Sequence, residues 1–436
     1  MKTRITNLMI IVALIIFTHS ALAKPFEIRE WQTKNGAHVV FHQAPDVPML
    51  DINIAFAAGS AYDGAQFGLS ALTLNLLDQG NGGLDAGAIA DKFAEAGAQY
   101  SGASSQDIMA LTLRTLTRPD ALKQATNMFA LLINHPNFPA DAFLREKNQQ
   151  LMRIKQNNER PNTIARNTFY QTLYGKHPYG HPIAGRSETV NALKVEDVRH
   201  FYQQYVVSKN AVIVLVGDIN EATAHQLAER ITRDLPKGQA AAAIPSAPPL
   251  AEEINIEILH DAPQSALRLG QLGITHHNSD YFALQVGNYI LGGASMESRL
   301  AHELREKRGL TYGVSSNFSP MPGNGPFIIS LSTKHNQAKI AWDVARETLA
   351  SMIKSGPNEQ ELRAAKQYLT GSFPLSLASN RNIANLLLRI TFYDLPKDFL
   401  NTYIDHINAV SIADIKQAFQ HQINPDKLLQ ITVGRS

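Results

Sequence analysis

The sequence predicts an α+β protein made of two duplicated domains, each a mostly antiparallel sheet covered by helices. Three observations support this prediction: the chain has 436 residues, its two halves share short sequences, and both helical and strand patterns occur along it. A single hydrophobic core rarely grows beyond ~250–300 residues, so we expect two domains. The composition, with 44% hydrophobic and 18% charged residues, is that of an ordinary globular protein.

The two halves repeat short sequences at a nearly constant spacing. The pairs with an offset of 217 (408 − 191 and 434 − 217) are Asn191, Ala192, Asp197, Val216 and Gly217 with Asn408, Ala409, Asp414, Val433 and Gly434. Near the start of each half the offset is 218 (260 − 42), and the pairs are His42, Ala44 and Pro45 with His260, Ala262 and Pro263. Because similar offsets occur at opposite ends of the unit, a duplication explains them better than chance.

A segment between the two copies has the composition of a linker. Four alanines at 240–243 precede Pro245, Pro248 and Pro249, and no apolar period runs through them. We therefore predict an N-terminal domain at 24–236, a linker at 237–253 and a C-terminal domain at 254–436.

Local patterns indicate which elements build the first domain. Asn35-Gly36 between the segments 27–33 and 37–42 predicts a tight hairpin. The run 212–216 predicts a buried strand. Helical periodicity covers the segments 69–77, 86–96, 121–134 and 140–157.

The first residues have the order of a secretory signal peptide. Lys2 and Arg4 precede an apolar run at 8–17, and Ala21-Leu22-Ala23 then precedes Lys24. We predict a signal peptide at 1–23 and an exported protein. The periplasm is the first expected destination, and secretion is the alternative. The apolar run is about half of the ~20 residues that span a bilayer, so we expect no stable membrane span after cleavage.

Composition excludes several classes of function. The chain contains no cysteine, which excludes disulfides, thiolate catalysis and cysteine-ligated zinc. A net charge of +2 without a basic run gives no reason to expect a nucleic-acid partner.

The segment 59–80, and above all Phe67-Gly68-Leu69-Ser70-Ala71-Leu72, resembles the zinc-binding helix of the pitrilysin and mitochondrial-processing-peptidase (insulinase) family of metallopeptidases. In active members this helix carries H-x-x-E-H, two histidine ligands and a glutamate general base. The resemblance places Ala71, Leu74 and Asn75 at these positions. It also places Met152 where the family has its third ligand, a glutamate, with Leu151 and Arg153 as neighbours if the register shifts by one. We therefore expect no metal in this chain.

Two histidine pairs offer no better metal site. His177 and His181 have helical ligand spacing, but Pro178, Gly180 and Pro182 between and beside them prevent a helix. The adjacent histidines at 276–277 stand in a predicted loop, where we expect a solvated surface.

The segments 291–300 and 303–312 resemble the best-preserved part of the family's second domain. The local pattern predicts a helix capped by Ser295, with an apolar face at Met296, Leu300 and Leu304, that ends at Gly309. The resemblance gives Arg305 and Tyr312 the roles of the arginine-tyrosine pair found in zinc-lacking subunits. A tyrosine hydroxyl donates to the scissile carbonyl or a neighbouring one, and a guanidinium binds substrate carbonyls.

Two other interpretations of this arginine remain open. Arg305 can instead pair with Glu303 or Glu306 as an ordinary surface residue, and Arg299 or Arg308 takes its place if the register shifts.

The resemblance covers about residues 28–433 and implies two related chains that close around an unfolded peptide. It implies a non-metal-binding subunit that binds and orients peptide substrates, inactive alone and active with a homologous partner that carries the zinc. The alternative is a catalytically inert structural or binding pseudoenzyme, like the core subunits of respiratory complexes.

Overall fold

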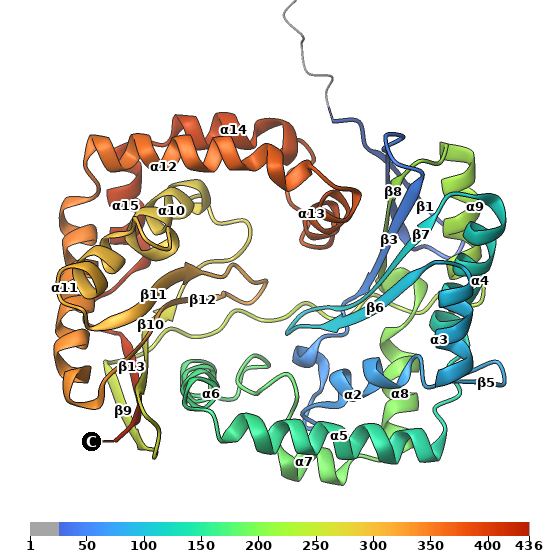
Figure 1. Cartoon of the computed structure of the whole chain (residues 1–436), viewed down its shortest axis with the longest axis horizontal. Coiled ribbons are helices and arrows are strands. Elements are labelled where there is room, and N and C mark those ends of the chain that lie inside the picture. The colour runs from blue at the N-terminus through green and yellow to red at the C-terminus, as the bar shows by residue number, and fades with distance from the viewer. Residues whose placement is uncertain (1–25, 436) are drawn as a thin grey trace, which may run out of the picture.

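The computed structural model describes residues 26–435, which form two sheets with helices around them (Figure 1). The predicted signal peptide at 1–23 lies outside the described residues. The first sheet has the order β1-β2-β8-β3-β7-β6 and the second the order β11-β12-β10-β13-β9. The strands of the first are β1 (Arg29–Gln32), β2 (His38–Gln43), β3 (Met49–Phe56), β6 (Gln99–Ser104), β7 (Met109–Leu116) and β8 (Ala211–Gly217). Those of the second are β9 (Ile254–Leu259), β10 (Ser265–Leu272), β11 (Thr311–Phe318), β12 (Pro326–Thr333) and β13 (Leu429–Gly434), and β4 (Gly80–Asn81) pairs with β5 (Leu84–Asp85).

The two sheets share one topology, which confirms the predicted α+β class. In each, one parallel pair (β2 with β8, β9 with β13) adjoins antiparallel pairs in the same sequence order. The repeat at the start of each half is out of register with the structure, however. Ala44 N donates to Gly217 O, and the equivalent bond runs from His260 N to Gly434 O, both at 2.9 Å. His260 therefore occupies the place of Ala44, two residues from the place that its match with His42 predicts.

Helices surround both sheets (Figure 1), and those of the first half include the segments that the periodicity predicts. In the first half they are α2 (Leu69–Leu76), α3 (Ala86–Glu95), α4 (Pro119–Asn134), α5 (Ala140–Asn158), α7 (Ser187–Ala192), α8 (Val195–Tyr205) and α9 (Glu221–Thr232). In the second they are α10 (Tyr281–Asn288), α11 (Ala338–Ser355), α12 (Glu359–Ser372), α14 (Phe399–Ala409) and α15 (Ile412–Gln422). The predicted hairpin is present, with Gly36 at φ 96° between β1 and β2.

The repeat at the end of each half reflects equivalent structure. Asp197 caps α8 by accepting a bond from Lys194 N at 2.7 Å, and Asp414 caps α15 in the same way from Ser411 N at 2.8 Å. A second contact is also shared. In each half a lysine of an earlier, longer helix (α5 or α12) donates to the backbone carbonyl of a residue that lies shortly before the capped helix, at 2.7 Å. The two bonds are Lys147 Nζ to Asn191 O and Lys366 Nζ to Asn408 O.

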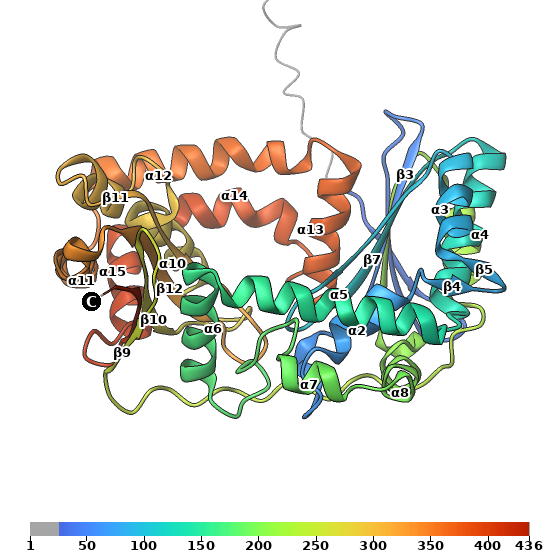
Figure 2. The ribbon, with the colours of Figure 1, turned by 60° about the horizontal axis from the view of Figure 1, so that its bottom comes forward.

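Two further helices are exchanged between the halves. α6 (Pro161–Tyr174) belongs to the first half in sequence, but its buried Phe169 packs in one cluster with Ile431 and Val433 of the second sheet. α13 (Asn380–Phe392) belongs to the second half, and its Leu387 packs with Val214 of the first sheet. α6 packs against β10 and β13, and α13 packs against β3 and β8, as both views allow the reader to follow (Figures 1 and 2).

The segment between α9 and β9 contains no helix or strand, and it contacts both halves. Ala241 N donates to Asn210 Oδ1 at 3.1 Å in the first half, and Ala247 N donates to Gly323 O at 3.0 Å in the second. The loop histidine His177 lies 2.8 Å from Pro245 O of this segment through its Nε2. None of the helices in residues 26–435 has the length and apolar character needed to cross a membrane.

His276 lies at the contact between the halves, so the expectation of a solvated surface was wrong for it. The imidazole is 9% exposed and stacks on Tyr393, at the end of α13, with ring centroids 3.8 Å apart, whereas His277 is exposed. Neither ring nitrogen of His276 has a hydrogen-bond partner within the described chain. Burial, with smaller contributions from Arg389 and His277, lowers the pKa of His276 to about 3.

The exchange of α6 predicts that truncating Phe169 destabilises the second sheet. Phe169→Ala should lower the free energy of unfolding by about 3–5 kcal/mol, the usual cost of a buried phenylalanine. Hydrogen exchange at β10 and β13 should accelerate in this variant. The matched control is Phe93→Ala in α3, which lies in the core of the first sheet. If both variants lose protection only in the first sheet, the exchange does not couple the halves.

The low pKa of His276 predicts acid sensitivity. Between the ordinary histidine pKa of about 6.5 and the folded value of about 3, the unfolded chain binds a proton that the folded chain does not. Stability is therefore complete above pH ~6.5 and falls as the pH is lowered toward ~3. His276→Phe, which retains the stacking on Tyr393, should lose less stability between pH 7 and pH 4.5 in denaturant titrations. Parallel losses in both proteins would exclude His276 as the cause.

Candidate functional site

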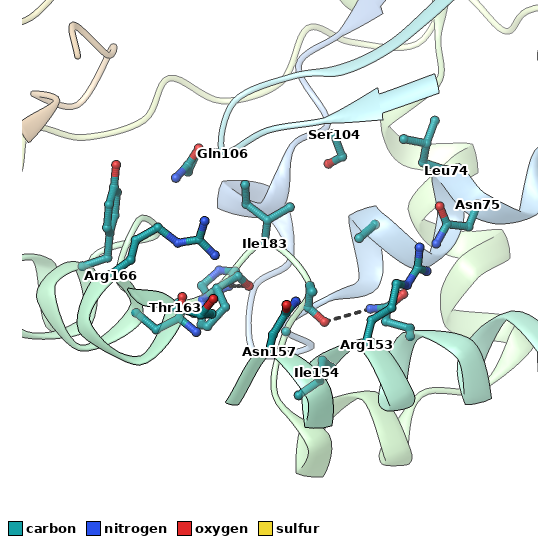
Figure 3. Close-up of a pocket in the computed structure, with 18 of the residues that line it drawn as sticks. Leu74, Asn75, Ser104, Gln106, Arg153, Ile154, Asn157, Thr163, Arg166 and Ile183 are labelled. Carbon is teal, nitrogen blue, oxygen red and sulfur yellow. Dashed lines mark hydrogen bonds between the residues drawn. The ribbon is translucent and has the colours of Figure 1, made fainter. Parts of the chain in front are cut away.

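A cavity of about 550 Å³ lies where the resemblance places the zinc site (Figure 3). Its walls come from α2, α5 and α6, from the edge strand β6 and from the loop around His181. Ala71, Leu74 and Asn75 all line it, so the three motif positions do share one face of a helix. The three positions that the resemblance assigns to the motif are therefore close together in the fold.

The start of α2 is held by a buried carboxylate. Asp63 accepts hydrogen bonds from the backbone N–H groups of Gly68 and Ser70, each at 2.7 Å. These N–H groups lie at the helix N-terminus, where they have no partner within the helix itself. Gly68, at φ 96°, makes the turn into the helix. These contacts orient the face of α2 that carries the motif positions toward the cavity.

The side chains on that face do not fit zinc. Ala71 and Leu74 offer only hydrocarbon, and the amide of Asn75 is a weak substitute for an imidazole. Leu74 fills space toward β6, where a Cβ on Gly102 would lie 2.9 Å from its Cδ1. Among residues 26–435 there is no group of three or more His, Asp or Glu side chains placed to hold a metal ion.

On α5 the structure places Arg153, rather than Met152, across the cavity from α2. Met152 is 62% exposed and faces a separate recess beside Lys155 and Ser187. Arg153 lines the cavity, and its guanidinium extends toward Asn75 (Figure 3). The assignment of the third ligand position to Met152 was therefore wrong by one residue. The motif on α2 does not specify the length of the chain between α2 and α5, so the register of α5 could not be determined from it.

The other histidines of the sequence prediction do not combine into a site. No helix forms across His177 and His181, in agreement with the prediction from the prolines. His181 lines the cavity, stacks on Phe67 at 4.1 Å between ring centroids, and has its pKa lowered by burial, so it is neutral at pH 7.

Arg305 and Tyr312 are brought together in the second half. Arg305 lies on a short π-helix, Ala301–Glu306, a type of turn often found at functional sites. Gly309, at φ 60°, ends that turn. The guanidinium then lies over the Tyr312 ring, with Cζ 5.0 Å from the centroid, and also contacts the Met296 sulfur.

Tyr312 projects from a bulge in the edge strand β11. Pairing with β12 shifts between Thr311 and Val314, so β11 has an extra residue at this point. Thr311 Oγ1 stabilises the bulge by donating to Ser332 O at 2.7 Å and accepting from Gly313 N at 3.2 Å. As a result the tyrosine is 86% exposed, and its hydroxyl is free to meet another molecule.

The alternative partners of Arg305 are already engaged. Glu303 pairs with Lys307 and Arg308, and Glu306 pairs with His302. Arg299 forms two bonds to Glu361, at 2.7 and 2.6 Å. Arg305 is thus the one arginine of 299, 305 and 308 without an acidic partner in the described chain.

The cap predicted for this helix was wrong. Ser298 Oγ, and not Ser295, accepts from Ala301 N at 3.3 Å, and Met296 remains 47% exposed. Leu300 and Leu304 are buried as expected.

The structure is an α+β chain of two similar halves, with a cavity that lacks metal ligands in the first and Arg305 in contact with Tyr312 in the second. Family models agree with this class: residues 38–187 match "Insulinase (Peptidase family M16)", and residues 192–369 match "Peptidase M16 inactive domain". The chain belongs to the M16 peptidase family and is an inactive-type member of it.

Relatives with different descriptions cover most of the chain. It is 26% identical to an uncharacterized zinc protease, YmxG, of Bacillus subtilis, over 93% of this chain and 98% of the relative. It is 25% identical to the non-peptidase homologue YmxG of Helicobacter pylori, over 86% and 87%. A solved structure of a peptidase M16 inactive domain from Pseudomonas fluorescens is 35% identical, with a TM-score of 0.91 over 94% of this chain and 98% of that one.

The geometry predicts which residue completes a rebuilt zinc site. A variant with Ala71→His, Leu74→Glu, Asn75→His and Arg153→Glu should bind zinc, because all four side chains line one cavity. The matched control carries Met152→Glu in place of Arg153→Glu and should bind zinc roughly tenfold more weakly or worse, since its glutamate points away. Competition with a zinc indicator measures both. Equal affinities would show that neither α5 residue reaches the metal.

Proposed function

We propose that this chain is the non-metal-binding subunit of a heteromeric zinc peptidase and that it binds and orients a peptide for hydrolysis on a partner's zinc. The observation that carries the proposal is the contrast between the two sites. The zinc positions hold Ala71, Leu74 and Asn75, whereas Arg305 is stacked on the exposed Tyr312 and has no acidic partner in the described chain.

The Arg305–Tyr312 pair suits a supporting role in peptide hydrolysis. The Tyr312 hydroxyl can donate to the carbonyl oxygen on which negative charge develops, and the Arg305 guanidinium can donate to neighbouring backbone carbonyls. Neither group can activate water, so hydrolysis needs a base and a metal from elsewhere. A homologous subunit with H-x-x-E-H supplies both in this proposal.

The location of Tyr312 on an edge strand also favours an extended peptide. Edge strands present unpaired backbone groups, and a peptide that adds to β11 brings its carbonyls beside the bulge. We place the assembly in the periplasm, on the strength of the predicted signal peptide.

The second candidate is a structural or binding pseudoenzyme. Its support is a fold likeness to a chain in a structure of complex III from Candida albicans, with a TM-score of 0.77 at 16% identity. A pseudoenzyme role explains the absence of ligands at the zinc positions equally well. It gives no reason for an Arg305 without an acidic partner that is stacked over an exposed tyrosine.

Removing the Tyr312 hydroxyl tests the proposed role. With the partner present, Tyr312→Phe should lower kcat by ~100-fold, about 3 kcal/mol of transition-state stabilisation. Assembly, followed by size-exclusion chromatography, should not change, because the ring stays in place. An unaltered kcat would exclude the hydroxyl from the mechanism.

Two arginines three residues apart provide a matched pair for the same assay. Arg305→Gln should raise KM and lower kcat, since its free guanidinium is proposed to contact substrate. Arg308→Gln should leave both unchanged, because that side chain is already held by Glu303. Similar losses in the two variants would indicate a general charge effect instead of a specific contact.

A further inference from the structure

The cavity beside the former zinc positions is cationic, and its lining contains no acidic side chain. Arg153 on α5 and Arg166 on α6 are the only residues of the lining that are charged at pH 7, because burial keeps His181 neutral. The rest of the lining is apolar or carries amides and hydroxyls. A site that holds zinc against a carboxylate in active relatives therefore holds two guanidiniums here.

Neither guanidinium has a partner within residues 26–435. Arg153 and Arg166 form no ion pair and donate no hydrogen bond to the described chain. Figure 3 shows them entering the cavity from opposite sides, Arg153 toward Asn75 and Arg166 from α6. Their donors are thus available to a bound molecule.

A third arginine increases the positive potential on the α6 side. Arg268 of β10, which donates to Asn162 Oδ1 at 2.9 Å, is close enough to Arg166 for the two charges to disfavour each other. Neither Arg166 nor Arg268 forms an ion pair with a carboxylate of the described chain. An anionic ligand would relieve the repulsion between them.

A buried glutamine and an open edge strand also line the cavity. Gln150 is 1% exposed and donates through Nε2 to Gly68 O and Ala184 O, at 3.0 and 2.9 Å. Its Oε1 is buried and has no hydrogen-bond partner in the described chain. The edge strand β6, with Ser104 in the lining, presents unpaired backbone groups alongside.

We propose that this cavity binds peptides through their carboxylates, with Arg153 and Arg166 as the residues that select acidic sequences. The inference rests on the proposed function in that the ligand is a peptide, and it names the class of peptide. Guanidiniums bind carboxylates through charge-assisted hydrogen bonds, often in pairs. Peptides with Asp or Glu near the bound segment, or with a free C-terminal carboxylate, are the ligands this chemistry recognises.

The test is binding of labelled 12-residue peptides to the purified chain, followed by fluorescence anisotropy. One peptide has glutamates at alternate positions, and a second has glutamines there. Each is prepared with a free and with an amidated C-terminus, so that the side-chain and terminal carboxylates are distinguished. Measurements at ~20 mM and ~300 mM salt report the electrostatic contribution.

We expect a carboxylate at one of these two places to tighten binding about tenfold at low salt, the size of one charge-assisted hydrogen bond. The preference should shrink at high salt. In the Arg153→Gln, Arg166→Gln double variant it should disappear, while Arg233→Gln, an exposed arginine at the end of α9, should retain it. Circular dichroism and thermal unfolding verify that the variants fold.

Equal affinity for all four peptides, or a preference that survives in the double variant, overturns this inference. Neither outcome touches the proposed pairing with a zinc-bearing subunit, which depends on assembly and on Tyr312. Conversely, selective binding of acidic peptides by a chain that never assembles with such a subunit overturns the proposed function and leaves the carboxylate site in place.

Discussion

The exchange of α6 and α13 is the contact on which the rest of the structure depends. Phe169 reaches the second sheet at Gly270, where the absence of a Cβ leaves room for the ring, and Asn53 of the first sheet donates to Asn385 of α13 at 2.9 Å. Each sheet therefore buries one face under a helix from the other half. The relative placement of the Arg153 cavity and the Tyr312 edge follows from this packing, because α6 forms a wall of the cavity and also a cover of the second sheet.

A change in charge separates this chain from a metallopeptidase with the same fold. Where a metal site needs imidazoles and carboxylates facing a divalent cation, the cavity presents Asn75, Arg153 and Arg166 with hydrocarbon from α2. Fixed guanidiniums stabilise anions but cannot generate hydroxide from water. In the proposed function the first half holds the peptide, and Arg305 and Tyr312 of the second half supply the donors for a developing oxyanion.

Much of the fold was predictable from the sequence, since local patterns determine local elements. The Asn35-Gly36 hairpin, the helices of the first half and the buried strand β8 all follow from periodicity and turn chemistry. The exchange of α6 was not predictable, because an apolar face shows that a helix is buried and not which sheet covers it. The same limit explains His276, whose burial comes from α13, more than 100 residues later in the chain. The position facing α2 on α5 was assigned to Met152, one residue before Arg153. The bulge that exposes Tyr312 has no recognisable signal in the residues that form it.

The central claim is that this chain contributes to peptide hydrolysis only together with a zinc-bearing homologue. The most direct measurement is hydrolysis of an unfolded peptide by the purified chain alone, by the H-x-x-E-H homologue alone and by the two mixed in equal amounts, each with and without a chelator. We expect a stoichiometric complex whose chelator-sensitive activity exceeds that of either chain, with none from this chain alone. Chelator-sensitive hydrolysis by this chain alone, or a mixture no more active than the homologue, would contradict it.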